Sequence, residues 1–325
     1  VVPAGYGLRV TIVNEKDADF YDPGWIDALS ALEVVECDII VALPTQTTSV
    51  IIQNALSHCL AMSNITNRKE RVLFTGAIAG LRPENLTGAK LAAVEDIGIL
   101  EGIQGETITD ILAGNVEDLA NYSVPDAFGQ TYRCVYFMPD EIVVQAGAEN
   151  VIVDGLYLAA AAAGYESADV IIQNPLTNKV LSGFSLGRNK LYTNAVLASL
   201  AAAGVTVLQP VAGGGRVVWG ITTSQSGYVE EQEISIIFIR DRIAKLFRTG
   251  FRGYIGTPSD LNTQAALQAR AVDLLNSFIS SGMITAYSNL VIAQDQVDPT
   301  QWNISVAVRP AYGINFIYVK VAVGQ

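Results

Sequence analysis

Apolar positions follow two patterns in the first two thirds of this chain. Nearly continuous apolar runs are typical of buried strands, and five segments have them: Glu33–Leu43, Arg71–Ala79, Thr131–Met138, Val205–Leu208 and Arg216–Thr222. Apolar residues three and four positions apart indicate helices, and four segments have this spacing: Thr47–Ser63, Glu106–Leu119, Ala148–Ala163 and Asn189–Ala203. We expect Gly164 to end the third helix. Strands that alternate with helices at this pace predict a layered α/β main domain over residues 23–233. Before it, Gly7–Asn14 predicts an incoming strand within residues 1–22, which we interpret as the end of a removed or inserted segment.

The pattern changes after the polar stretch Ser224–Glu233, which we interpret as a domain boundary. Beyond it, the sequence predicts three strands and two helices: strands at Ile234–Ile239, Asn303–Arg309 and Ile314–Val323, and helices at Asp241–Thr249 and Thr263–Ser281. The last helix has the clearest apolar face, formed by Leu267, Ala271, Leu274 and Phe278. These elements predict a smaller α+β domain over residues 234–325, so the fold class is α/β with an α+β C-terminal domain.

Composition limits the class of protein. The 325 residues are 50% hydrophobic, which is enough for real cores, but no uninterrupted apolar run reaches the roughly 18 residues of a membrane span. We therefore expect no membrane insertion. No signal peptide follows Val1, and we interpret the chain as a processed product or a trimmed fragment. Cys37, Cys59 and Cys134 lie in apolar surroundings at wide spacing, which predicts buried free thiols and synthesis at a reducing site.

Charge is distributed unevenly along the chain. The formal net charge of −12 argues against nucleic-acid binding, which needs clustered Lys and Arg. Residues 234–325 contain eight basic and five acidic side chains, whereas residues 1–233 contain twelve basic and twenty-seven acidic ones. Eight acids and no base lie between Leu91 and Gln130. Their spacing matches no cation-binding loop, so we interpret them as a solvated or partner-facing surface.

The motifs predict no catalytic, cofactor-binding or metal-binding residues. Gly213-Gly-Gly-Arg216 leads into a predicted strand and lacks the helix and Lys-Ser/Thr of a phosphate loop, so we interpret it as a structural turn. No Gly-x-Ser-x-Gly motif occurs. The lone histidine, His58, is next to Cys59, and adjacent residues on a helix point in different directions. We therefore expect neither enzymatic activity nor a cofactor.

A basic stripe in the second domain is the first candidate for a partner surface. Its four residues recur at spacings of three and four and share one helical face: Arg242, Lys245, Arg248 and Arg252. Ile243, Leu246 and Phe247 point the other way, toward a core. An ordinary solvated face is the alternative, but the acidity of the remaining chain favours electrostatic docking to a partner surface.

The last predicted strand is the second candidate, because it is apolar on nearly both faces and lies at the chain end, where strands usually fray. An exposed apolar edge strand invites pairing. We expect it either to be central in its own sheet or to add to a neighbour's. The inter-subunit strand residues are then Ile314, Phe316, Ile317, Tyr318, Val319, Val321 and Val323.

Seven segments keep a familiar order and spacing across residues 150–325: Gly155–Gly164, Pro175–Lys179, Leu200–Val205, Gly215–Thr223, Ile234–Arg240, Tyr254–Gly256 and Gly282–Ile284. In this order they resemble the C-terminal half of the phage contractile tail sheath family, which R-type pyocin sheaths also resemble. Residues 1–149 resemble the α/β middle region of that family more weakly. Family members usually carry an N-terminal arm, and a chain starting at Val1 departs from that pattern.

The resemblance implies a structural subunit of the virion tail, made in the cytoplasm of the bacterial host. Such subunits form a homo-oligomeric lattice, a helical sleeve around the tail tube, and contract to drive the tube through the host envelope. The implied partners are further copies, the tail tube protein, and the baseplate and tail terminator proteins. The resemblance also implies that the C-terminal domain lies against the tube and that terminal arms donate strands to neighbours.

Other classes remain open. The chain could serve a related contractile injection machine, of the R-type pyocin or type VI kind. An α/β nucleotide-binding enzyme is a different class, opposed by the missing glycine fingerprint. A secreted adhesin or a capsid-like shell protein is a third, opposed by the missing signal peptide and the odd number of cysteines.

Overall fold

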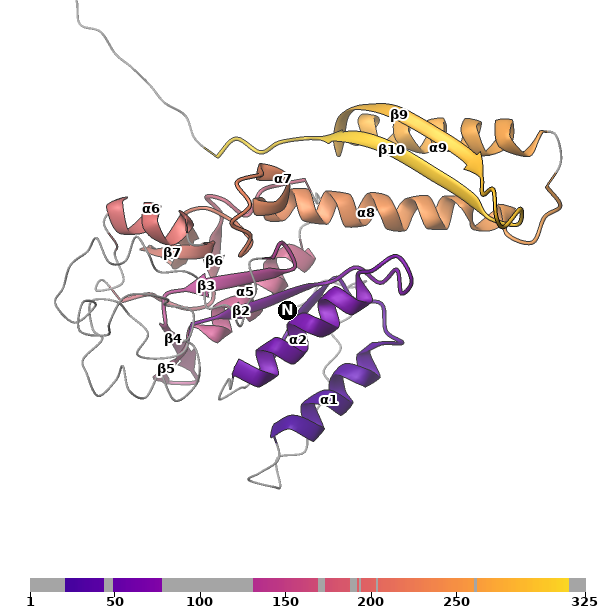
Figure 1. Cartoon of the computed structure of the whole chain (residues 1–325). Helices are drawn as coiled ribbons and strands as arrows, with labels where there is room; N and C mark the ends of the chain where they lie inside the picture. The colour runs from indigo at the N-terminus through magenta and orange to yellow at the C-terminus, as the bar shows by residue number, and fades with distance from the viewer. Residues whose placement is uncertain are drawn as a thin grey trace, which may run out of the picture. The chain divides into compact units, whose positions relative to one another are not determined.

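The computed structural model describes residues 21–43, 49–77, 131–168, 173–187, 192, 194–202, 204–259 and 262–315. The chain divides into two compact units (Figure 1). Unit 1 comprises Val1–Val170 and Pro175–Ile234, and unit 2 comprises Ile171–Asn174 and Ser235–Gln325. Two predicted elements, the strand Gly7–Asn14 and the helix Glu106–Leu119, lie outside the described residues.

A six-stranded mixed sheet forms the centre of unit 1, in the order β1-β2-β3-β7-β8-β6. Its first four strands are parallel, and β8 is antiparallel to both of its neighbours. The strands are β1 (Ile39–Val41), β2 (Val72–Gly76), β3 (Cys134–Met138), β6 (Val180–Ser182), β7 (Val205–Val211) and β8 (Gly214–Val217). The helices of this unit are α1 (Tyr21–Leu32), α2 (Ser49–Met62), α5 (Leu156–Ala168), α6 (Asn194–Ala202) and α7 (Val229–Gln232). The predicted α/β class is therefore confirmed.

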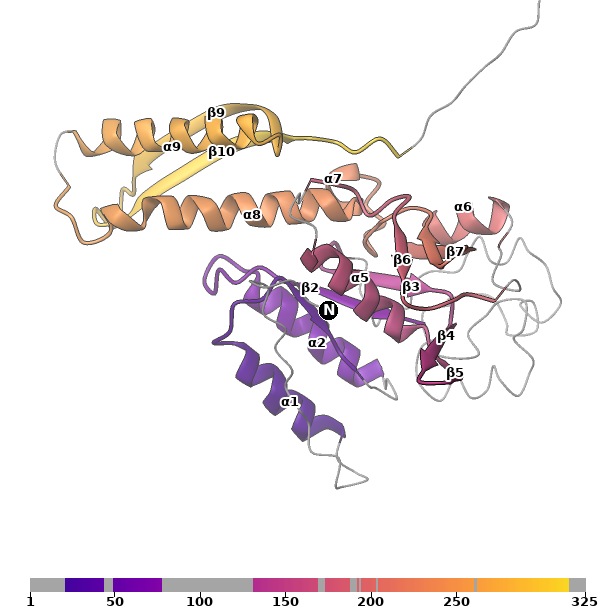
Figure 2. The same cartoon turned by 180° about the vertical axis from the view of Figure 1, so that it is seen from behind.

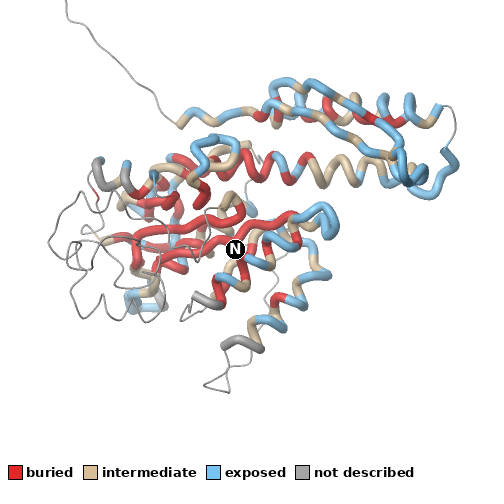
Figure 3. Tube along the Cα trace, in the orientation of Figure 1, coloured by how far each residue is buried: buried red, intermediate tan, exposed pale blue. Residues whose placement is uncertain are grey.

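The two faces of this sheet have separate apolar partners, because successive side chains of a strand point to opposite faces. On one face Leu73, Tyr136 and Val205 pack with α1, α2 and α6 in a single core cluster. On the other face α5 contacts β2 and β3. The rings of Phe74 and Phe137 lie 5.3 Å apart. Figure 3 shows β2 and β3 buried along their whole length, as continuous apolar runs predict for central parallel strands.

The predicted helix Ala148–Ala163 is wrong in its first half. Residues Glu149–Asp154 form strand β5, which pairs antiparallel with β4 (Glu141–Ala146) in a hairpin. The run Val151-Ile-Val153 has the β-branched side chains that favour a strand. Helix α5 begins at Leu156 and continues through Gly164 to Ala168, so Gly164 does not end it.

The glycine motif forms a turn, as predicted. Gly213 has φ +84, a conformation that glycine adopts without strain, and it joins β7 to β8. Strand β8 ends at Val217, earlier than predicted. At the other edge of the sheet β1 is shorter than the predicted Glu33–Leu43, because residues 33–38 form an exposed turn and a short loop.

Unit 2 contains two long helices and an antiparallel hairpin. The helices are α8 (Ile234–Phe251), whose first residue belongs to unit 1, and α9 (Thr263–Ser280); η5 (Arg252–Tyr254) follows α8. The hairpin consists of β9 (Ile284–Gln294) and β10 (Trp302–Pro310). The predicted face of α9 is confirmed, since Leu267, Ala271 and Phe278 are buried and Leu274 packs against the core.

The predicted strand Ile234–Ile239 is wrong, because these residues are the first turns of α8, which also includes the separately predicted helix Asp241–Thr249. Six consecutive residues from Ile234 to Ile239 are buried. A helix that is covered on all sides shows no 3.6-residue period, and β-branched isoleucines then suggest a strand. Strand β9 was not predicted at all, since its alternation is broken at Asn289, where φ is +52 and the ladder shifts register nearby.

Candidate assembly surfaces

The basic stripe lies where the sequence placed it, with one change. Arg242, Lys245 and Arg248 lie on α8, whereas Arg252 begins η5. Arg242 and Arg252 are exposed, and Lys245 and Arg248 are half-buried. The opposite side of α8 faces a core, as predicted: Ile243 is buried there, with Leu246 and Phe247 packed beside it.

An aromatic series holds the C-terminal end of α8 in place. Phe247 stacks on Phe251 with 5.9 Å between ring centroids, and Phe251 lies 6.1 Å from Tyr254. Phe247 also contacts Phe278 of α9 at 5.7 Å. Aromatic pairs at such distances stabilise beyond simple area burial. The ends of the stripe therefore rest on a firmly packed support.

The hairpin of unit 2 has open edges in the part of the chain that the structure describes. There β9 and β10 pair only with each other. One face of the hairpin packs on the helices through Ile284, Ile292 and Ile304. Its strands are otherwise largely exposed (Figure 3). Two-stranded sheets are marginal in water, so this hairpin depends on the helices and can accept further strands.

The predicted terminal strand falls mostly outside the described residues. Phe316, Ile317, Tyr318, Val319, Val321 and Val323 all lie outside them. Ala311 donates a backbone hydrogen bond to the carbonyl of Met283, 3.0 Å away, after which residues up to Asn315 have no regular structure. Ile314 is 79% exposed.

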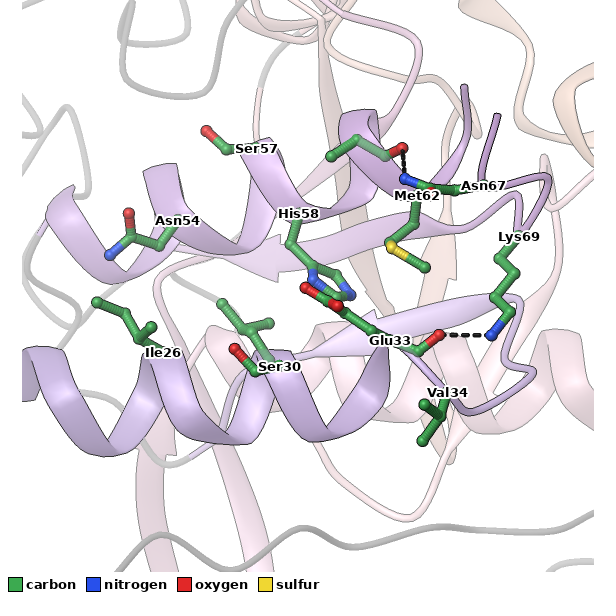
Figure 4. Close-up of a pocket in the computed structure, with 12 residues that line it drawn as sticks. Ile26, Ser30, Glu33, Val34, Asn54, Ser57, His58, Met62, Asn67 and Lys69 are labelled. Atoms are coloured by element: carbon green, nitrogen blue, oxygen red, sulfur yellow. Dashed lines mark hydrogen bonds between the residues drawn. The ribbon is translucent and has the colours of Figure 1, made fainter. Parts of the chain in front are cut away.

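A groove of about 590 Å³ lies between α1 and α2 (Figure 4). Its apolar wall includes Ile26, Leu29 and Met62, and the Glu33 side chain points across it toward His58. Lys69 donates a hydrogen bond from Nζ to the backbone carbonyl of Glu33 at 2.5 Å. The groove is therefore mixed in character, with apolar walls and ionisable groups at its rim.

Behind the groove, Arg71 is completely buried and supports the C-terminal end of α1. Its Nη1 donates to the carbonyl of Leu32 at 3.1 Å, and its Nη2 donates to that of Val35 at 3.0 Å. Leu32 is the last residue of α1, and cations are stabilised by the helix dipole at that end of a helix. Burial, and secondly the Arg71 charge, lower the pKa of His58, while Glu33 acts in the opposite direction.

The described residues contain no cluster of candidate metal ligands. No group of three or more His, Cys, Asp or Glu among them could hold a metal ion. Burial raises the pKa of Cys59 to about 12 and raises that of Cys134 still further, so neither thiol is a nucleophile at neutral pH. None of the described helices has the length and apolar character needed to cross a bilayer. The candidate functional features described above are three surfaces: the stripe, the open hairpin and the groove.

Comparison with known proteins identifies the architecture. No family model matches the sequence. The chain is 27% identical over 201 residues, 59% of its length, to a tail sheath protein of Mycobacterium phage Bxz1, of which the match covers 33%. It therefore spans about a third of that relative. The contracted helical sheath of the anti-feeding prophage has a TM-score of 0.63 at 14% identity, covering 94% of this chain and 76% of that one.

The sheath tail protein of Listeria innocua has a TM-score of 0.62 at 12% identity, covering 89% of this chain and 57% of that protein. The chain has the fold of contractile sheath proteins. The resemblance that the sequence motifs indicated is thus confirmed, and it extends to residues before 150, where the motifs were weaker.

Proposed function

We propose that this chain is a subunit of a contractile tail sheath, which polymerises as a helical sleeve around a tail tube and contracts to drive that tube through a host envelope. The observation that carries the proposal is the agreement of two independent likenesses. One is sequence identity to a phage tail sheath protein, and the other is the fold of sheaths from contractile systems. The partners follow from it: further copies, the tube, the baseplate and the tail terminator.

The surfaces of unit 2 fit this role. In the proposal, the open β9–β10 hairpin of one subunit accepts the terminal segment Ile314–Val323 of another, which satisfies backbone groups on both. The basic stripe of α8 faces an acidic band on the tube or on a neighbouring subunit. Contraction is then a change between two packings of the lattice, with the energy stored in its extended form.

Negative-stain microscopy of the purified chain, alone and with a tube protein, tests the proposal. Striated tubes or stacked rings are the expected result. A chain that stays monomeric at all concentrations, with and without tubes, contradicts it. We also propose that the chain neither hydrolyses nucleotides nor binds them tightly. Calorimetric titration with ATP and magnesium should then show no binding tighter than about 100 µM, or roughly −5.5 kcal/mol. Tighter binding would favour the enzyme alternative.

Related contractile injection machines are the second candidate class. Among the similar structures are a sheath complex of an extracellular contractile injection system and a baseplate of the anti-feeding prophage. The subunit chemistry is the same in both classes. The genes next to the one that encodes this chain would separate the two classes. Capsid genes would indicate a phage, and genes of a secreted machine without capsid genes would indicate an injection machine.

A further inference from the structure

Two exposed apolar side chains lie at one end of unit 2. Ile255 follows η5 and is 80% exposed, and Val297, in the β9–β10 turn, is 94% exposed. Figures 1 and 2 both show the C-terminal end of α8 and the β9–β10 turn at the same end of this unit. Tyr254, which precedes Ile255, and Trp302, at the start of β10, pack against one core cluster, which includes Ile292. The two turns therefore form one surface.

Both turns are held by hydrogen bonds. The backbone N–H of Ile255 donates to the carbonyl of Arg252 at 3.3 Å, and that of Thr257 donates to the carbonyl of Tyr254 at 3.2 Å. In the other turn, the N–H of Val297 donates to Oδ1 of Asp295 at 2.9 Å. An apolar side chain that is exposed on an ordered turn is pre-organised for a partner, because little conformational entropy is lost when it binds.

The two turns carry opposite charges. Arg252 is exposed beside Ile255, and its guanidinium has no hydrogen-bond or ion-pair partner among the residues that the structure describes. Asp295 and Asp298 lie on either side of Val297, and Asp298 is exposed. We call Arg252, Ile255, Val297 and Asp298 the unit 2 tip. It is apolar in the middle, basic on the α8 side and acidic on the hairpin side.

The α1–α2 groove carries apolar side chains and both signs of charge, as the tip does. Ile26 is 47% exposed at its wall, and Val34 is 83% exposed at its end. Glu33 lies on the α1 side, where Asp27 and Glu36 are also exposed. Lys69 comes from the segment before β2, where its Nζ contacts the backbone carbonyl of Glu33, and the exposed Arg68 precedes it in the chain. The groove thus has apolar walls, with an acidic side chain from the end of α1 and basic side chains from the segment before β2.

We propose that the unit 2 tip of one copy of this chain docks in the α1–α2 groove of a second copy. Ile255 packs against Ile26 and Leu29, Arg252 pairs with Glu33, and Asp298 pairs with Lys69. Tip and groove are different surfaces of the same chain, so the contact is head-to-tail. Such a contact can repeat without closing and builds a helical polymer. The inference rests on the proposed sheath function and names one lattice contact within it.

Charge exchange tests this pairing in the whole chain. Glu33→Arg and Arg252→Glu each place like charges at every contact and should raise the critical concentration for polymerisation by about tenfold, while the double variant, which restores opposite charges, should recover most of that loss. Recovery cannot arise from misfolding. The inference is overturned if the single variants polymerise like the unmodified chain. It is also overturned if the double variant polymerises no better than the single variants.

Removal of the apolar anchor is a second measurement. Ile255→Asp should raise the critical concentration by at least about tenfold, as hot-spot losses do. The matched control is Ile152→Asp, because Ile152 is also an exposed isoleucine, 67% exposed, but lies on β5. If both substitutions have the same effect on polymerisation, Ile255 is not a specific anchor and the inference fails.

Cross-linking tests the proximity directly. Ser30 lines the groove, and Gly253, which lies in η5 between Arg252 and Ile255 of the tip, is an exposed glycine where a Cβ meets nothing within 4 Å. In polymers mixed from Ser30→Cys and Gly253→Cys chains, a short bismaleimide should give covalent dimers. A mixture with Gly164→Cys in place of Gly253→Cys is the control, because Gly164 is equally open but lies on α5. Equal yields from both mixtures overturn the inference. If the parent chain forms no polymer at all, it is the sheath function that fails.

Discussion

Arg71 places Nη1 2.9 Å from Nε2 of His58, behind the α1–α2 groove. A guanidinium can only donate hydrogen bonds, so Nε2 accepts and the imidazole in this contact is neutral. Protonation of His58 would remove the acceptor and set two cations against each other. Glu33 is the acidic group facing the ring, and Lys69 donates to the backbone carbonyl of Glu33. The contact therefore links the packing of α1 and α2 to pH.

We predict that the chain loses stability on mild acidification. His58 is the only histidine, and its pKa in the folded chain lies below the ordinary value of 6.5. On acidification, His58 therefore binds its proton at a higher pH in the unfolded chain than in the folded chain. The stabilisation from neutral His58 is complete above about pH 6.5 and is lost as the pH falls below that value. Thermal melting between pH 7.5 and 5 should show a decrease in Tm. His58→Gln should reduce that decrease, and an unchanged pH profile in this variant would contradict the assignment.

Arg71 itself should be worth more than any surface cation. Arg71→Met leaves the carbonyls of Leu32 and Val35 without the donors that the buried guanidinium supplies, and we expect a loss of about 3 kcal/mol in the free energy of unfolding. Arg71→Lys should recover little, because one ammonium cannot span several carbonyls as the planar guanidinium does. Urea unfolding measures both. The matched control is Arg68→Met, a change at an exposed position that should cost less than about 0.5 kcal/mol.

Reversal of the stripe should weaken assembly on tubes. Each exposed ion pair contributes only about 0.2–1 kcal/mol, but a lattice repeats the contact many times. The double variant Arg242→Glu, Lys245→Glu should bind tubes less, and what binding remains should depend strongly on salt. Cosedimentation with tubes across a salt series is the measurement, with the exposed Arg216→Glu of β8 as the control. Normal sheaths at every ionic strength would mean that the stripe is merely solvated.

Loss of the terminal strand should block polymerisation without unfolding unit 1. Val319→Pro removes one backbone donor from the predicted strand, whereas Val319→Thr keeps it and serves as the control. A chain ending at Pro310 should stay soluble and monomeric, since β10 ends there. Circular dichroism checks the fold, and microscopy counts the tubes. Tubes formed by the truncated chain would place the linkage elsewhere.

The helix that the sequence predicted best has a single buried face. Helix α9 differs from its prediction by one residue, because its apolar stripe faces a core and its polar side faces solvent. The prediction of a strand at the beginning of α8 was wrong for the opposite reason, because all residues from Ile234 to Ile239 are buried. The continuous apolar runs of β2 and β3 predicted buried strands, which the structure confirms.

The surfaces were harder to predict than the core. The stripe followed from spacing alone, but the tip depends on β9, which was not predicted, and on Ile255, an unremarkable residue in a glycine-containing turn. Exposure of a single isoleucine has no signature in the sequence. Arg71, at the start of a predicted strand, likewise gave no sign that it supports α1, because its partners are backbone carbonyls 36 and 39 residues away.

The thiols of unit 1 determine how the chain responds to air. A thiolate, not a thiol, reacts with oxidants, and Cys59 and Cys134 are buried in the core with raised pKa values, about 12 for Cys59. Neither should form adducts or cross-links while unit 1 stays folded. Only Cys37, which is half-buried, is left to react. The core thiols of unit 1 should therefore stay reduced under oxidising conditions without an added reductant.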